Sequence, residues 1–138
     1  MAHPRSSAYA DDITVLNNER LLRRIHPRWK VLDDNSRQWR VSSAAYTDSK
    51  DGSPTSVSLE QTLIQHKLPI ELLLHGYQDY SLAAITMGFA RTIGQGVQRD
   101  PQPNDPSHAL LFGNKTDMVR RKLAKNSAWI VAPQDPPR

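Results

Sequence analysis

The chain has 138 residues, a formal net charge of +4 and a hydrophobic fraction of 38%. A chain of this length forms one domain rather than two. Because it lacks cysteine, disulfides and thiolate chemistry are excluded, and no segment has the pattern of a signal peptide or a membrane span. We therefore expect a soluble, cytoplasmic protein of bacterial type, whose basic charge permits an anionic partner without requiring one.

The composition predicts one folded domain between two polar ends. Residues 1–12 lack apolar periodicity and are predicted to form a flexible N-terminal tail. Residues 133–138 are predicted to form a disordered C-terminal tail, because their prolines cannot continue a regular element. Residues 13–132 then form a single α+β domain.

The first elements of this domain are short. Residues 19–25 have the apolar spacing of a helix, but so brief a run is equally compatible with a strand. Two runs that alternate aromatic or β-branched residues with polar ones flank a turn-forming cluster at residues 33–36. This pattern predicts a β-hairpin, with Trp39 as a buried core anchor and residues 42–46 extending the second strand.

The middle of the chain is predicted to be mainly helical. Residues 47–56 are a loop by composition, and Ser58, followed three residues later by glutamine, forms a capping box that predicts a helix over residues 59–65. Pro69 begins a second short helix, because proline suits the first helical turn. The apolar residues 80–89 are predicted to form a buried strand.

The last third of the chain completes the predicted fold. Residues 91–107 are predicted to be a proline-stiffened loop, residues 108–112 a strand, and residues 117–125 a helix capped by Thr116. Residues 129–131 pack the end of the chain against the rest. Together these elements predict an α+β fold, in which a small, mostly antiparallel sheet has two or three helices packed on one face.

The loop from Arg91 to His108 is the leading candidate for a binding site. It also carries Gln95, Arg99 and Asp100 between two apolar elements. Arginine side chains match phosphate and carboxylate oxygens, and a loop that proline preforms loses little entropy on binding. The leading hypothesis is therefore a small binding or adaptor domain that recognises a protein segment or an anionic group through this loop.

A small metal-independent enzyme acting on a phosphate ester or a nucleotide is the alternative. His108 would be the acid or base, with Asp100 or Asp105 to orient it and His26 as a second titratable group if folding brings them together. Arg91 or Lys115 would hold the anion. No cofactor is expected, and no spacing of histidines and carboxylates matches a metal-binding motif.

Nucleic-acid binding through the last helix is a further alternative. Lys115, Arg121 and Lys125 form a basic cluster at this helix, and the last two lie one turn apart on its outer face. Such a cluster could follow a phosphate backbone, but a solvated helix face has the same composition.

The order of short motifs along the chain resembles that of a group of short, stand-alone bacterial proteins of unknown function. The motifs are S-S-A-A-Y, then G-F-A-R-x-x-G-Q, then D-P-x-P-x-x-P-x-H-A. The resemblance extends from Leu21 to Trp129. It implies no particular activity, and it favours a bacterial component other than a metabolic enzyme.

Overall fold

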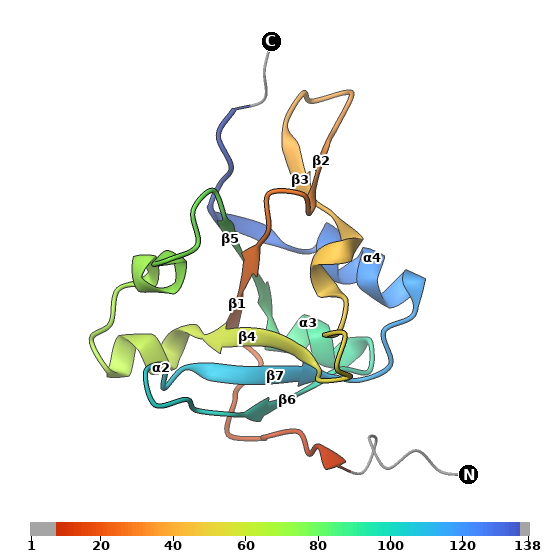
Figure 1. Cartoon of the computed structure of the whole chain (residues 1–138). Helices are drawn as coiled ribbons and strands as arrows, with labels where there is room; N and C mark the ends of the chain where they lie inside the picture. Colours follow the sequence, from red (N-terminus) through yellow and green to blue (C-terminus); the bar gives the residue numbers. More distant parts are fainter. Residues whose placement is uncertain (1–7, 136–138) are drawn as a thin grey trace.

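The computed structural model describes residues 8–135, so residues 1–7 and 136–138 of the predicted tails lie outside the described residues (Figure 1). Among the described residues, no helix combines the length and the apolar character that crossing a membrane requires. The elements in chain order are β1 (Arg20–Ile25), β2 (Lys30–Leu32), β3 (Trp39–Val41), the 3₁₀ helix η1 (Ser43–Tyr46), β4 (Thr55–Leu59), α2 (Glu60–Gln65), the 3₁₀ helix η2 (Ile70–Leu74), β5 (Ser81–Thr86), α3 (Met87–Thr92), β6 (Gly96–Arg99), β7 (His108–Phe112), α4 (Asp117–Lys125) and β8 (Ala128–Val131).

Six strands form one antiparallel sheet in the order β6-β7-β4-β1-β5-β8, and β2 and β3 form a separate hairpin. This confirms the predicted α+β fold with a mostly antiparallel sheet. In Figure 1, β4, β7 and β6 lie side by side, and β1 and β5 run across them. The sheet can bend there because β1 pairs with β4 only at Leu21 and Leu22, whereas all six of its residues pair with β5.

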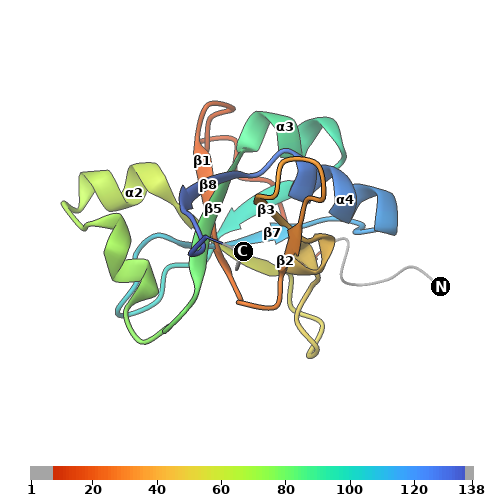
Figure 2. The same ribbon diagram turned by 90° about the horizontal axis from the view of Figure 1, so that it is seen from above.

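Helices cover both faces of the bent sheet. The larger core joins alternate strand residues to α3, α4 and η1, whereas a smaller core joins the other face to α2 and η2. Figure 2 shows α2 and α4 on opposite sides of the strands. Because successive side chains of a strand point to opposite faces of the sheet, one strand contributes to both cores. In β1, Leu21 belongs to the larger core and Leu22 to the smaller one.

The capping box predicted at Ser58 is wrong, because this residue belongs to β4. Its strand neighbours are Leu22 in β1 and His108 in β7. Helix α2 begins only at Glu60, and its N-cap residue Leu59 makes no side-chain cap. Pairing with two strands that are distant in the sequence therefore outweighs the local helix signal.

Three further predictions need correction. Residues 91–107 are not one loop, because they include the end of α3 and the strand β6. The apolar run 80–89 changes from β5 to α3 at Thr86, whose hydroxyl accepts a hydrogen bond from the amide of Phe89. Residues 42–46 form η1 rather than more strand. The open choice between helix and strand at residues 19–25 is decided for a strand, since β1 covers Arg20–Ile25, and the helix α4 with its Thr116 cap is confirmed.

Trp39 is not the core anchor that the hairpin pattern predicts. The hairpin itself is confirmed, but it lies outside the six-stranded sheet, and Trp39 is half-buried and absent from both cores. The fully buried aromatic residue is Tyr46 of η1, which is 0% exposed. Its hydroxyl lies 2.6 Å from Ser127 Oγ and so joins η1 to the end of α4.

Burial of Tyr46 predicts a specific pH dependence of stability. Burial raises the pKa of its hydroxyl to about 12, whereas the usual value is 10.0. Between these values the unfolded chain loses a proton that the folded chain keeps, so the free energy of unfolding falls as pH rises, by roughly 1 kcal/mol per pH unit. Urea unfolding should show the parent losing stability relative to Tyr46→Phe over this range, because the other groups that titrate there, Arg23 and Lys115 among them, are present in both proteins. Parallel curves for the two proteins would contradict the assignment.

Candidate functional site

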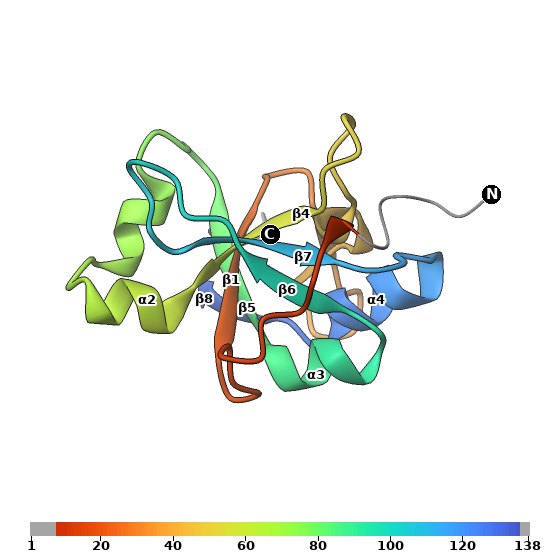
Figure 3. The same ribbon diagram turned by 90° about the horizontal axis from the view of Figure 1, so that it is seen from below.

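The side chain of Arg91, which was predicted to hold an anion, makes hydrogen bonds to other residues of the chain. Its Nε donates to Asp11 Oδ2 at 2.9 Å, its Nη1 to Asn17 Oδ1 at 2.7 Å, and its Nη2 to the carbonyl of Asp12 at 3.1 Å. These partners belong to the segment before β1, which runs along β6 (Figure 3). The amide of Asp12 donates to the carbonyl of Val97 at 2.8 Å. Arg91 therefore fixes this segment to the sheet.

Arg99 and Gln95 also make structural contacts. Arg99 Nε donates to Asp12 Oδ2 at 3.0 Å, and hydrogen bonds from Thr14, with a smaller effect of Arg99, lower the pKa of that carboxyl. Gln95 is buried and donates to the carbonyl of Asn114 at 3.0 Å. The predicted binding residues at this end of the loop thus hold β6 to its neighbours.

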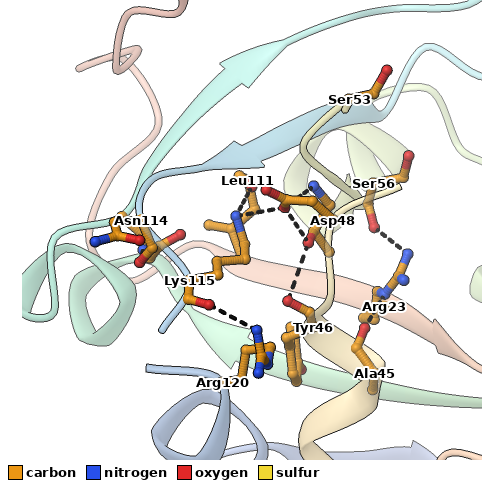
Figure 4. A network of polar contacts seen from close by, with 12 residues as sticks. Arg23, Ala45, Tyr46, Asp48, Ser53, Ser56, Leu111, Asn114, Lys115 and Arg120 are labelled. Atoms are coloured by element: carbon orange, nitrogen blue, oxygen red, sulfur yellow. Dashed lines mark hydrogen bonds and ion pairs between the residues drawn. The ribbon is translucent and has the colours of Figure 1, made fainter. Parts of the chain in front are cut away.

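Lys115 is the buried centre of a polar network (Figure 4). Its side chain is only 4% exposed and its Nζ lies 2.9 Å from Asp48 Oδ1, while it donates to the carbonyl of Leu111 at 2.7 Å. Burial lowers the pKa of Lys115, and Asp48 opposes this shift. Asp48 also accepts hydrogen bonds from the amide and hydroxyl of Thr55. A lysine held in this way joins the chain before β4 to the chain before α4.

Arg23 is a second cation in the same region, and it is half-buried. It donates to the carbonyls of Ala45 and Ser56, as Figure 4 shows, and its guanidinium lies 5.2 Å from the centre of the Trp29 ring. Burial lowers its pKa to about 10, so it stays charged at neutral pH. By donating to these two backbone carbonyls, the Arg23 side chain links η1 and β4 to β1.

Asp100 and His108 are brought together, as the enzyme hypothesis requires. His108 Nδ1 lies 3.1 Å from Asp100 Oδ2, and Nε2 lies 3.2 Å from the hydroxyl of Ser56. His26 does not join them, because it packs against Trp29 and Tyr80 and its Nδ1 accepts the amide of Arg28. Sequence reasoning missed Ser56, since it assigned this residue to the end of a loop.

Arg121 and Lys125 lie where the helix prediction placed them, on the exposed face of α4. They border a cleft of about 750 Å³ between α4 and the β2–β3 hairpin. The lining adds a third cation, Arg40, and two tryptophans, Trp39 and Trp129, which the sequence did not connect to α4. We call this space the α4 cleft.

The walls of the α4 cleft are basic and aromatic. Arg40, Arg121 and Lys125 are exposed, and no aspartate or glutamate is among the described residues that line the cleft. The indole rings are held in place, because Trp129 Nε1 donates to the carbonyl of Trp39 at 3.0 Å and Trp39 Nε1 to that of Gln134 at 2.9 Å. Such a surface can hold an anion and a flat ring together.

No protein-family model matches the chain, and no curated protein or solved structure matches it significantly. Within residues 8–135, no three histidine, aspartate or glutamate side chains gather in a group that could hold a metal ion. The candidate sites therefore rest on their own geometry.

Proposed function

We propose that the protein is a small binding domain that holds a single strand of nucleic acid in the α4 cleft. The observation that carries this proposal is the joining of three exposed cations and two fixed indoles in one cleft whose described lining has no acidic residue. Proteins that bind single strands combine cations for the phosphates with aromatic rings on which bases stack. A volume of about 750 Å³ is in the range of ordinary ligand pockets.

As in the leading hypothesis from the sequence, the proposed ligand is anionic. Its proposed binding site is the cleft at α4, however, and not the loop of residues 91–108. Arg91 and Arg99 are paired with Asp11 and Asp12, so binding an external anion there would require these ion pairs to break. Arg121 and Lys125 form no ion pair with any described residue. An incoming phosphate at the cleft therefore replaces only water and counterions.

Salt dependence of binding tests the proposal. A short fluorescein-labelled oligothymidylate should bind the parent, with an affinity that falls as salt increases. Replacing Arg121 and Lys125 together by alanine should reduce the slope of log affinity against log salt by about 1.4, because each phosphate contact on a single strand contributes about 0.7. Fluorescence anisotropy at several salt concentrations measures both slopes.

The matched control is Lys50→Ala with Lys122→Ala, which removes the same charge from exposed positions that do not line the cleft. This control should keep the parent slope. Trp39→Ala should weaken binding about 5- to 150-fold, the loss of one stacked base. A flat titration at low salt, equal slopes in the two double variants, or equally tight binding of polyglutamate would contradict the proposal.

A further inference from the structure

A second group of polar side chains, which the α4 cleft does not use, lies on the sheet face covered by α2 and η2. Alternation along β4 and β7 turns Val57 and Ala109 into the larger core, so their neighbours Ser56 and His108 face the other way. Asp100 directly follows β6, the strand beside β7, and its amide donates to the carbonyl of His108 at 2.9 Å. Three strands thus bring a hydroxyl, an imidazole and a carboxylate together.

These groups are connected in one line. Ser56 Oγ lies 3.2 Å from His108 Nε2, and His108 Nδ1 lies 3.1 Å from Asp100 Oδ2. His108 Nδ1 also lies 3.0 Å from the backbone carbonyl of Asp100, which is the hydrogen bond that orients the ring, and the carboxylate lies beside it. A hydroxyl next to a base that is oriented in this way is the arrangement of an activated serine nucleophile. Ser56 is half-buried and the His108 side chain is 17% exposed, so both keep access to solvent.

Two adjoining spaces surround this line of groups. A groove of about 450 Å³ has apolar walls that include Leu63, Leu68 and Leu72. A narrow cavity of about 10 Å³ borders Ser56. His108 and Arg24 line both spaces.

Arg24 is suited to stabilise negative charge between the two spaces. Its guanidinium lies 4.1 Å from the centre of the Tyr77 ring, and its Nη1 donates to the carbonyl of Leu73 at 3.2 Å. These contacts fix a cation beside Ser56 and His108. A fixed cation at the place where an oxyanion forms lowers the barrier to acyl transfer.

We propose that Ser56, His108 and Asp100 form an esterase site for a neutral carboxylic ester with a short acyl group and an apolar alcohol. The cavity at Ser56 is no larger than about one water molecule, so an acyl group enters it only when neighbouring side chains move, which restricts the ester to the shortest acyl groups. The leucine walls of the adjoining groove suit an apolar alcohol. A phosphate dianion is disfavoured, because Arg24 is the single arginine among the described residues that line the groove, and Asp105 also lines it.

The reaction begins when Ser56 Oγ bonds to the carbonyl carbon and its proton passes to His108 Nε2. The carbonyl electron pair moves onto the oxygen, beside Arg24, and returns as the bond to the alcohol breaks. The alcohol takes the proton from His108. Water then attacks the acyl group on Ser56 by the same route, so that ester and water give acid and alcohol. The backbone carbonyl of Asp100 holds the imidazole in the required tautomer. The Asp100 carboxylate is a positioning group that stabilises the positive charge on the imidazole as it takes the proton.

Covalent labelling of the full chain tests the nucleophile directly. A fluorophosphonate with small alkyl groups should form an adduct on Ser56 that peptide mass spectrometry locates. The parent should hydrolyse p-nitrophenyl acetate and not p-nitrophenyl phosphate. A label on another residue or no label, no acetate hydrolysis, or hydrolysis of the phosphate would overturn the proposal.

Variants then test the roles of the three residues. Ser56→Ala and His108→Gln should each lose the label and reduce kcat/KM for the acetate about 10²- to 10⁴-fold, and the double variant should be no worse than either. Asp100→Asn should reduce kcat and leave KM unchanged. The matched control is Ser58→Ala, on the same face of β4 and in the same cavity, which should keep parent activity. Unchanged hydrolysis in Ser56→Ala, or equal loss in Ser58→Ala, would refute the assignment.

Discussion

Tyr46→Ala is expected to reduce the free energy of unfolding by about 3–5 kcal/mol, the cost of removing a large aromatic side chain from a packed core. The ring is 0% exposed within the core that joins the sheet to α3 and α4. The substitution also removes the hydrogen bond to Ser127, whose oxygen then loses one of its partners. Urea unfolding beside the parent measures the difference, and Tyr46→Phe separates the contribution of the hydroxyl from that of the ring.

Trp39→Ala is the comparison that makes this prediction specific. Although tryptophan is the larger residue, Trp39 is half-buried and lies outside both cores. Its ring lies under Lys30 of the hairpin, and its Nε1 donates one hydrogen bond to the carbonyl of Gln134, in the segment after β8. We expect a loss of about 1–2 kcal/mol, the sum of these two contacts. If Trp39→Ala destabilises the protein as much as Tyr46→Ala, the hairpin is part of the core, and the assignment of Tyr46 rather than Trp39 as the buried aromatic anchor is wrong.

Elements made by local interactions were predictable from the sequence. The β2–β3 hairpin follows from two alternating runs around a turn, and α4 follows from its cap at Thr116 and the apolar stripe that contains Leu123. Strand β4 was not predicted, because the capping-box pattern at Ser58 indicated the start of a helix. Its partners are Leu111 at one end and Leu21 at the other, and no local pattern indicates pairings so distant in the sequence.

The same distinction explains the sites. A contact of His108 with Asp100 or Asp105 could be expected because these residues are close in the sequence. Asp100 and His108 are 8 residues apart at the ends of one hairpin, whereas Ser56 is 52 residues from His108. Arg121 and Lys125 share one helix, but Trp129 reaches them from β8 of the sheet and Arg40 from the separate β2–β3 hairpin. The roles of Arg91 and Lys115 were not visible, since their acidic partners precede them by 80 and 67 residues.

The last prediction concerns Asp48, which balances the buried charge of Lys115. Asp48→Ala leaves an ammonium that is 4% exposed without its carboxylate, and removing one partner of a buried ion pair costs about 3–5 kcal/mol. We expect the lower end of this range, because Asp48 itself is 29% exposed and part of the ion pair is screened by water. Lys115→Met should cost less, since it leaves Asp48 hydrated and still bonded to Thr55.

The pH dependence of this penalty distinguishes lost charge balance from lost packing. Burial holds the pKa of Lys115 below its usual 10.5, so between the folded and unfolded pKa values the unfolded chain binds more protons. Stability from this group therefore rises with pH as the folded lysine becomes neutral. Urea unfolding of Asp48→Ala and the parent, at neutral pH and at about pH 10, should show a smaller difference in the free energy of unfolding at the higher pH.

The double variant Asp48→Ala with Lys115→Met should be more stable than Asp48→Ala alone. A penalty that is constant with pH, or a double variant less stable than Asp48→Ala, would mean that Asp48 acts through Thr55 and the loop before β4 rather than through the charge of Lys115.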